Sequence, residues 1–117
     1  MEVYDTANKL VEEIRQTKEY KDFQEAKEKV FKNPENEEKV KEFARLKKEI
    51  QIAEVTQNAD GTNEEELKEK SSKVLKLFNL LVENEDIKDM FEKEIRVTTL
   101  MSDVTKIIGE VIQEVTY

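Results

Sequence analysis

Residues 74–82 read VLKLFNLLV, and residues 83–91 continue as ENEDIKDMF. Seven of the first nine residues are aliphatic or aromatic, although 41% of the whole chain is charged. On a helical wheel the apolar side chains of 74–82 span an arc of about 220°. A helix that covers a single core usually shows an apolar stripe little more than ~100° wide. The stretch therefore predicts a helix that contacts two neighbours, or one neighbour and a partner protein.

The composition of the rest of the chain favours long helices in one domain. The 117 residues include two Gly, one Pro, no Cys and no His. β-Sandwiches and barrels need many turn residues, whereas a Glu-, Lys- and Leu-rich chain with few Gly and Pro is typical of helices. A chain of this length suits one domain. We therefore expect residues 1–117 to form a single helical domain.

The first 32 residues predict two helices. Apolar residues from Val3 to Ile14 share one face of a helical wheel, and those from Tyr20 to Phe31 fall on roughly the opposite side. One straight helix cannot bury both sets against the same neighbour. The change of face predicts helices at about 2–16 and 19–32, with Thr17 capping the second.

Capping residues mark the remaining boundaries. Asn33-Pro34 places an N-cap residue before a proline at the first helical position. We expect that helix to end at Asn58-Ala59-Asp60-Gly61, because Gly tolerates the left-handed conformation that ends helices. Thr62 and Glu65 form a capping box that opens the helix containing VLKLFNLLV. Asn84 is the expected cap of the last helix.

The last helix shows a coiled-coil pattern. Its apolar positions alternate in steps of three and four, which is the signature of a left-handed coiled-coil seam. Glu94 is the polar exception, and we interpret it as a solvent-exposed residue, with a register device or partner contact as the alternative. Gly109 either allows another helix to approach closely or marks fraying. From Ile87 to Val115 the helix should be ~43 Å long. The apolar positions are Ile87, Met90, Val97, Met101, Val104, Ile108, Val111 and Val115.

These patterns predict an all-α fold of about five helices, an antiparallel helical bundle with a long C-terminal, coiled-coil-like helix. Apolar surface on the last two helices should remain for a second copy or a related chain, because burying it yields about 25 cal/mol per Å². A helical wheel does not separate core from interface, so we expect some candidates to be core. The candidate interface residues are Leu77, Leu80, Leu81, Leu100, Val104, Ile107 and Val111.

The sequence lacks the residues on which most catalytic and metal sites depend. Without His and Cys, the chain has no Ser–His–Asp or Cys–His arrangement and none of the usual zinc, haem or iron–sulfur ligands. Gly61 and Gly109 lie too far apart for a glycine-rich phosphate loop. The segment from Asp60 to Glu65 does not have the ligand spacing of an EF-hand. We therefore predict a non-enzymatic protein with no cofactor and no metal site.

The net charge of −8 disfavours direct binding of nucleic acid, since phosphate contacts usually need a basic surface. No apolar run reaches the ~18 residues of a membrane span, no signal peptide is evident, and the absence of Cys makes the cytoplasm the expected location. Two alternatives to a regulatory adaptor remain: a chaperone-like structural coiled-coil module, and an accessory RNA-binding protein. The latter would present Lys32, Lys39, Lys41, Lys47 and Lys48.

The order of these motifs resembles the YlbF/YmcA family of control-of-competence regulators. The resemblance covers essentially the whole chain and rests on helix-packing residues. Those residues are Tyr4, Asp5, Ala7, Leu10, Ile14, Thr17, Glu19, Tyr20, Ala26, Pro34, Glu35, Val40, Phe43, Leu46, Gly61, Asn84, Glu85, Ile107 and Ile108.

The resemblance implies a small bacterial helical bundle that tends to form a homodimer. It also implies a role in competence, sporulation and biofilm formation, in a complex that acts with a membrane-associated ribonuclease in messenger RNA processing. Certain family members bind an iron–sulfur cluster through a cysteine-containing tail. This chain ends at Tyr117 and has no Cys, so the cluster is not carried over and the short, stand-alone subgroup is the expected place for it.

Overall fold

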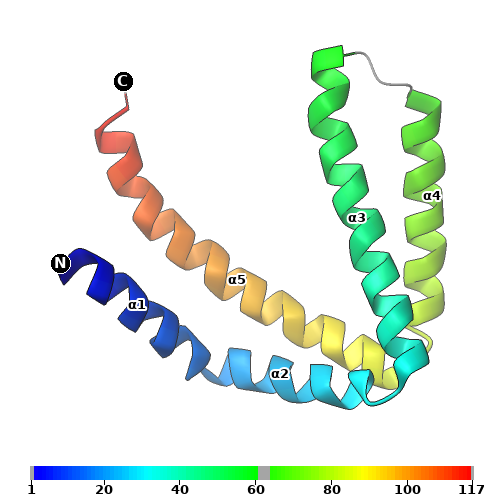
Figure 1. Ribbon diagram of the computed structural model, residues 1–117, viewed down its shortest axis with the longest axis horizontal. Coiled ribbons are helices and arrows are strands. Elements are labelled where there is room, and N and C mark those ends of the chain that lie inside the picture. The colour runs from blue at the N-terminus through cyan, green and yellow to red at the C-terminus, as the bar shows by residue number, and fades with distance from the viewer. Residues whose placement is uncertain (1, 61–63, 117) are drawn as a thin grey trace. The chain divides into compact units, whose positions relative to one another are not determined.

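The computed structural model describes residues 2–60 and 64–116, with side chains described except at 56–60. Five helices cover nearly all of these described residues, and no strand occurs among them (Figure 1). This confirms the all-α prediction and the long C-terminal helix. The helices are α1 (Glu2–Arg15), α2 (Lys18–Phe31), α3 (Pro34–Asp60), α4 (Glu64–Leu81) and α5 (Glu85–Glu114).

Three of the predicted caps hold their helix ends in place. The hydroxyl of Thr17 accepts a hydrogen bond from the backbone N–H of Tyr20 at 3.2 Å, so α2 begins directly after it. The side-chain oxygens of Asn33 and Asn84 accept from the first backbone N–H groups of α3 and α5 at 2.9–3.3 Å. The first two helices each end one residue earlier than predicted, at Arg15 and Phe31.

The predicted turn at Gly61 and the N-cap at Thr62 lie outside the described residues. α3 continues to Asp60, and α4 begins at Glu64. Three acidic residues occupy the first turn of α4, where the positive end of the helix dipole favours them.

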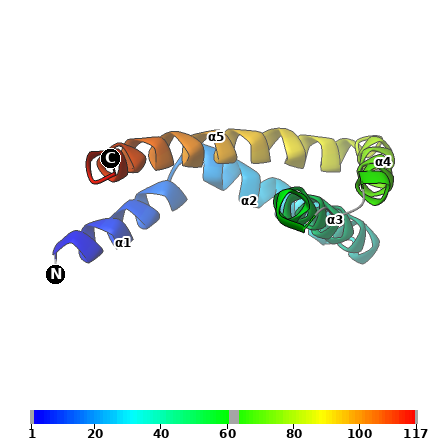
Figure 2. The ribbon, with the colours of Figure 1, turned by 90° about the horizontal axis from the view of Figure 1, so that it is seen from above.

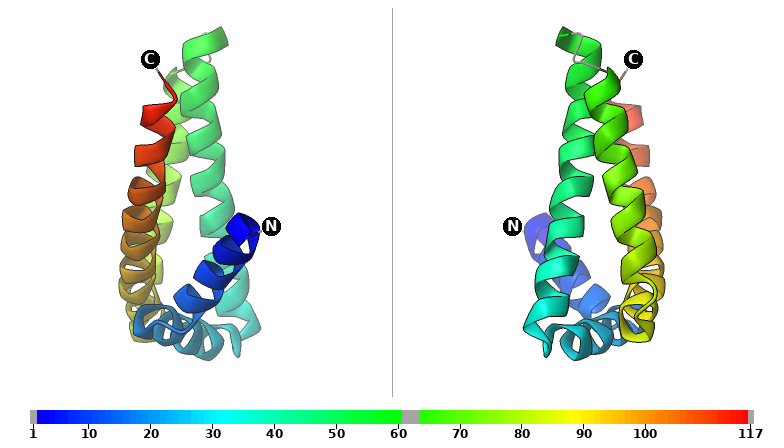
Figure 3. Two further views of the ribbon diagram at one scale, coloured as in Figure 1. Left: turned by 90° about the vertical axis from the view of Figure 1, so that its left-hand side faces the viewer. Right: turned by 90° about the vertical axis from the view of Figure 1, so that its right-hand side faces the viewer.

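Residues 29–88 form one compact unit, which is centred on the α3–α4 hairpin. The two helices pack side by side along their length (Figure 3). The rings of Phe43 and Phe78 meet across the hairpin, with centroids 5.9 Å apart. Lys29 near the end of α2 forms an ion pair with Asp86 in the first turn of α5, at 3.3 Å. The buried apolar residues of this unit are Val30, Val40, Phe43, Leu81 and Ile87.

Residues 1–28 and 89–117 form the second compact unit, which contains α1, most of α2 and most of α5. Its buried residues, among those described, are Ala26 on α2 and Met90 on α5. No residue of α1 is buried. The core of this unit is therefore confined to the region where α2 accompanies the early part of α5.

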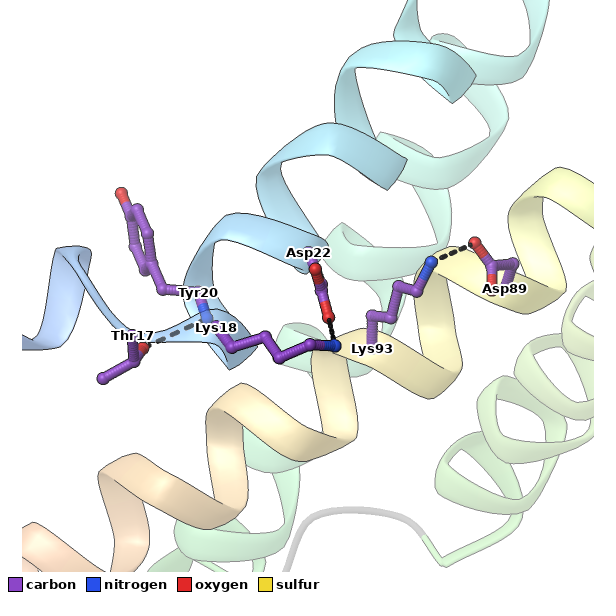
Figure 4. Close-up of polar contacts among 6 residues, drawn as sticks. All are labelled: Thr17, Lys18, Tyr20, Asp22, Asp89 and Lys93. Atoms are coloured by element: carbon purple, nitrogen blue, oxygen red, sulfur yellow. Dashed lines mark hydrogen bonds and ion pairs between the residues drawn. The ribbon is translucent and has the colours of Figure 1, made fainter.

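Charged residues of α2 and α5 influence one another within this unit. Lys18 donates a hydrogen bond to Asp22 at 2.9 Å on α2, and Lys93 donates one to Asp89 at 2.9 Å on α5 (Figure 4). The hydrogen bond from Lys18, and then the positive charges of Lys93 and Arg96, lower the pKa of Asp22 below its ordinary 3.8 despite some desolvation. The hydrogen bond to Asp89 likewise raises the pKa of Lys93 above 10.5, and the charge of Asp22 adds to this effect.

Candidate protein interface

The apolar seam of α5 changes from buried to exposed along the helix. Ile87 near its start is 1% exposed, whereas Met101 is 43% exposed and Val115 is 74% exposed. The same three-and-four spacing continues throughout, so the amino-acid pattern of the helix does not cause the change. The change follows from the presence or absence of neighbouring helices.

The C-terminal part of α5 has no helix of its own unit packed closely along it. The N-terminal end of α1 and the C-terminal end of α5 lie apart in both views (Figures 1 and 2). α1 also leaves its own apolar residues Val3, Tyr4 and Val11 exposed. Two helices of this unit therefore present exposed apolar side chains among its described residues.

The seven candidate interface residues fall into three groups. Leu80, Ile107 and Val111 are exposed, as an interface requires. Leu77, Leu100 and Val104 are half-buried. The last of the seven, Leu81, is 2% exposed and belongs to the core.

The burial of Leu81 has a local reason. Leu81 is the last residue of α4, and its carbonyl accepts a hydrogen bond from the backbone N–H of Asn84 at 3.1 Å. It stands at the corner where α4 ends and α5 begins. A helical wheel carries no information about such a corner, so it could not distinguish Leu81 from Leu80.

Several exposed apolar residues were absent from the predicted set. On α5 they are Met101, Ile108 and Val115, which belong to the three-and-four pattern, and Ile95 and Ile112, which lie outside it. On α1 the exposed residues share one face with Leu10 and Ile14, which are half-buried. For α1, the sequence feature that could have indicated an interface was the length of its apolar face. On α4, Leu75 is exposed in addition to Leu80.

The lysines of the RNA-binding alternative are largely engaged within the chain. Lys39 pairs with Glu35 at 3.2 Å and Lys41 pairs with Glu37 at 2.8 Å. The amines of Lys41 and Lys47 lie 5.8 and 5.3 Å from the ring centroids of Phe31 and Phe43. Acidic partners beside these lysines reduce the positive potential that a phosphate backbone would meet.

The described residues offer little to a catalytic or metal site. No group of three or more acidic residues among them could hold a metal ion. None of the described polar or charged side chains is fully buried. A hollow lies at the C-terminal end of α1 and extends into the connection to α2. It is lined by Lys9, Glu12, Glu13, Gln16 and Thr17.

Two unusual residues of α5 lie on or beside the exposed part of the helix. Glu94 is half-buried. A Cβ added at Gly109 would meet nothing within 4 Å, so no other part of the described chain approaches this glycine closely. Within the described ranges, no helix combines the length and apolar character that crossing a membrane requires.

The described residues define an all-helical protein that exposes apolar side chains on its helix faces. The family model described as "Control of competence regulator ComK, YlbF/YmcA" matches residues 3–113. The chain therefore belongs to the YlbF/YmcA family.

Individual relatives agree with this membership over nearly their whole length. A UPF0342 protein of Symbiobacterium thermophilum is 37% identical over 110 residues, which cover 94% of this chain and 93% of the relative. A UPF0342 protein of Pediococcus pentosaceus is 36% identical, with 96% and 93% covered. A third, from Desulfitobacterium hafniense, is 32% identical, with 98% and 88% covered.

Proposed function

We propose that this chain is a non-enzymatic adaptor that regulates through helix-mediated contacts with other proteins. The observation that carries the proposal is the row of exposed apolar side chains on α5, between Met101 and Val115. Transfer of such side chains out of water is favourable at about 25 cal/mol per Å², so a protein surface that covers them gains stability. Large exposed apolar patches commonly mark protein–protein contacts.

The family supplies the biological setting of the proposal. Control of competence is the process named for the family to which the chain belongs. By its resemblance to family members, the proposed adaptor also serves sporulation, biofilm formation and ribonuclease-dependent processing of messenger RNA. Its contact partners are then a second copy, a related family chain or a ribonuclease-associated complex.

The proposal is tested by deleting the gene in its natural host and restoring variants. Leu80→Glu on α4 and Leu100→Glu on α5 place a charge on the proposed surfaces, and Asn79→Glu places the same charge outside the apolar arc of α4. We expect the wild type and Asn79→Glu to restore competence, and each Leu variant to restore less than about a tenth of it. Full rescue by both Leu variants, with normal protein levels, would contradict the proposal.

No observation favours the RNA-binding or chaperone alternatives at the same strength. RNA binding makes a sharp prediction of its own, namely a steep loss of affinity as salt increases. A chaperone-like module would bind unfolded clients without preference for any one native protein.

We also propose that residues 1–117 fold as one domain. Helices α2 and α5 each supply residues to both compact units, so unfolding of either helix affects both. Thermal unfolding followed by circular dichroism should show a single transition. Two separate transitions would contradict this proposal.

A further inference from the structure

Helix α3 has apolar residues on two opposite sides. One side packs against α4, where Phe43 is buried and its ring meets that of Phe78 (Figures 1 and 3). Ile52 follows Phe43 by nine residues, which places it on the opposite side of the helix at 100° per residue. Ile52 and Val55 are 54% and 74% exposed. The side of α3 that faces away from α4 therefore ends in an exposed apolar pair.

This second side has the spacing of a contact between helices. Alternating steps of four and three residues connect five exposed positions over ~21 Å, as in a coiled-coil seam. Within residues 41–55, these five and Ala44 share an arc of about 100° that contains no acidic residue. Residues 39–48 include five basic residues and one acidic residue, although the whole chain carries a net charge of −8. The five positions, which we call the α3 outer seam, are Lys41, Arg45, Lys48, Ile52 and Val55.

The cations of the α3 outer seam can accept further carboxylates. Lys41 pairs with Glu37 at 2.8 Å, and Arg45 pairs with Glu49 at 2.8 Å. Such exposed pairs within one helix are weak, and a guanidinium has donors for more than one carboxylate. Lys48 forms no ion pair with any residue that the structure describes. A carboxylate from another protein therefore meets three exposed cations in a row and displaces no strong contact.

The order of residues in the seam disfavours pairing with the same seam of another copy. Two parallel copies would place the three cations opposite the same three cations, which repel each other. Two antiparallel copies would place cations opposite Ile52 and Val55, which leaves those charges without partners. A different helix satisfies both parts of the seam if it carries acidic residues opposite the cations and apolar residues opposite the apolar pair.

Nucleic acid and membrane surfaces fit the seam less well than a helix does. Single strands usually stack their bases on aromatic side chains, and the α3 outer seam has none. Binding to a phosphate backbone depends on many cations, whereas this seam offers three in a chain of net negative charge. A helix that lies in a membrane surface buries a long apolar face with aromatic residues or Leu, and Ile52 and Val55 form only a short one.

We propose that the α3 outer seam binds an acidic amphipathic helix of a different protein. The carboxylates of that helix face Lys41, Arg45 and Lys48, and its apolar side chains cover Ile52 and Val55. The inference goes beyond the proposed function, because the seam lies on α3 and the surfaces proposed above lie on α4 and α5. The affinity should fall as salt increases, since the ion pairs at this exposed site are screened.

Fluorescence anisotropy with labelled synthetic peptides and the purified full chain tests the proposal. The first probe is a helical peptide with three Glu followed by two Leu at the four-and-three spacing of the seam, and with Ala and Gln elsewhere. The second probe has the same residues in reverse order, as an antiparallel partner requires. A control peptide carries its three Glu on the side of the helix opposite the two Leu. We expect one of the two probes to bind at least about tenfold more tightly than the control.

Variants of the chain test the charges and the apolar pair separately. Lys48→Glu should weaken binding of the preferred probe at least about tenfold, and Ile52→Gln should weaken it as well. A probe with Lys in place of Glu should bind the Arg45→Glu, Lys48→Glu double variant more tightly than it binds the wild type. Lys68→Glu makes the same change of charge at an exposed position of α4 and should leave binding unchanged. Circular dichroism checks that each variant keeps its helical content.

Equal binding of the probes and the control peptide, or no binding of either probe, would overturn the proposal. Binding of polyuridylate RNA or phosphatidylglycerol vesicles that Lys48→Glu abolishes, while both probes fail to bind, would assign the seam to nucleic acid or to membrane instead. Leu80→Glu and Leu100→Glu lie outside the seam and should bind the preferred probe as the wild type does. The outcome for the seam is therefore independent of the outcome of the competence test.

Discussion

The two halves of α5 follow one sequence pattern and have opposite environments. In the first half, Ile87 and Met90 are fully buried. In the second half, Ile108 and Val115 occupy the same seam and are exposed. An apolar spacing therefore determines which side of a helix seeks a neighbour, whereas the rest of the fold determines whether this chain provides one.

The largest expected effect is a difference between the two halves of α5 in how much each contributes to the free energy of unfolding. Ile87→Ala should lower the free energy of unfolding by about 2–5 kcal/mol, because it leaves a cavity in a packed core. Ile108→Ala removes the same atoms from an exposed site and should cost no more than about 0.5 kcal/mol in dilute, monomeric protein. Urea unfolding measures both values. Equal decreases in the free energy of unfolding would contradict the difference in burial between the two halves of α5.

The next largest effect on stability is expected at Asn84, the N-cap of α5. Asn84 accepts hydrogen bonds from the backbone N–H groups of Asp86 and Ile87 at 3.0 and 3.2 Å. Asn84→Ala should therefore destabilise the chain by about 1 kcal/mol, within a usual range of 0.5–2. Asn79→Ala is the matched control, since Asn79 is exposed within α4 and caps no helix. An Asn84→Ala variant whose free energy of unfolding in urea equals that of the wild type would contradict the role of this cap.

A glycine in the exposed half should give a gain in stability. Gly costs up to about 1 kcal/mol relative to Ala within a helix, and an added Cβ at position 109 meets nothing within 4 Å. Gly109→Ala should therefore raise the melting temperature of the dilute protein, and Ser102→Ala should raise it by less. A lower melting temperature for Gly109→Ala would reveal a contact that this structure lacks.

The smallest expected effect concerns Asp22 on α2, which is influenced by the positive charges of Lys93 and Arg96 in the first half of α5. The pKa of Asp22 is lowered on folding, so its contribution to stability is present above pH 3.8 and is lost as the pH falls through the lower, folded value. Asp22→Asn should melt below the wild type at pH 7, and the gap should close in acid. Asp103→Asn removes a charge from the exposed half as a control. A gap that persists unchanged below the folded pKa would contradict the ionic origin.

The helix boundaries could be predicted from the sequence because caps act locally. Thr17, Asn33 and Asn84 each bond backbone groups two or three residues away. The division of apolar residues between core and surface depends on distant elements. Neighbouring Leu80 and Leu81 share the same apolar arc, yet one is exposed and the other is buried. The local sequence has no information on this difference.

The candidate interface was predictable in part for the same reason. The regular spacing identified the face of α5 that carries Val111, and the breadth of the apolar arc indicated that more than one neighbour was needed. The exposure of Val3 and Tyr4 depends on the course of α1 relative to the end of α5, within their common unit. Only the three-dimensional structure shows that these helices leave their faces uncovered.

Amide hydrogen exchange along α5, measured at protein concentrations from nanomolar to micromolar, tests the central claim most directly. A second copy that covers the exposed half should increase protection between residues 100 and 115 as concentration rises. Protection between residues 87 and 90 should stay constant, because Ile87 and Met90 are already buried within the chain. Protection that is independent of concentration in both halves would contradict the account.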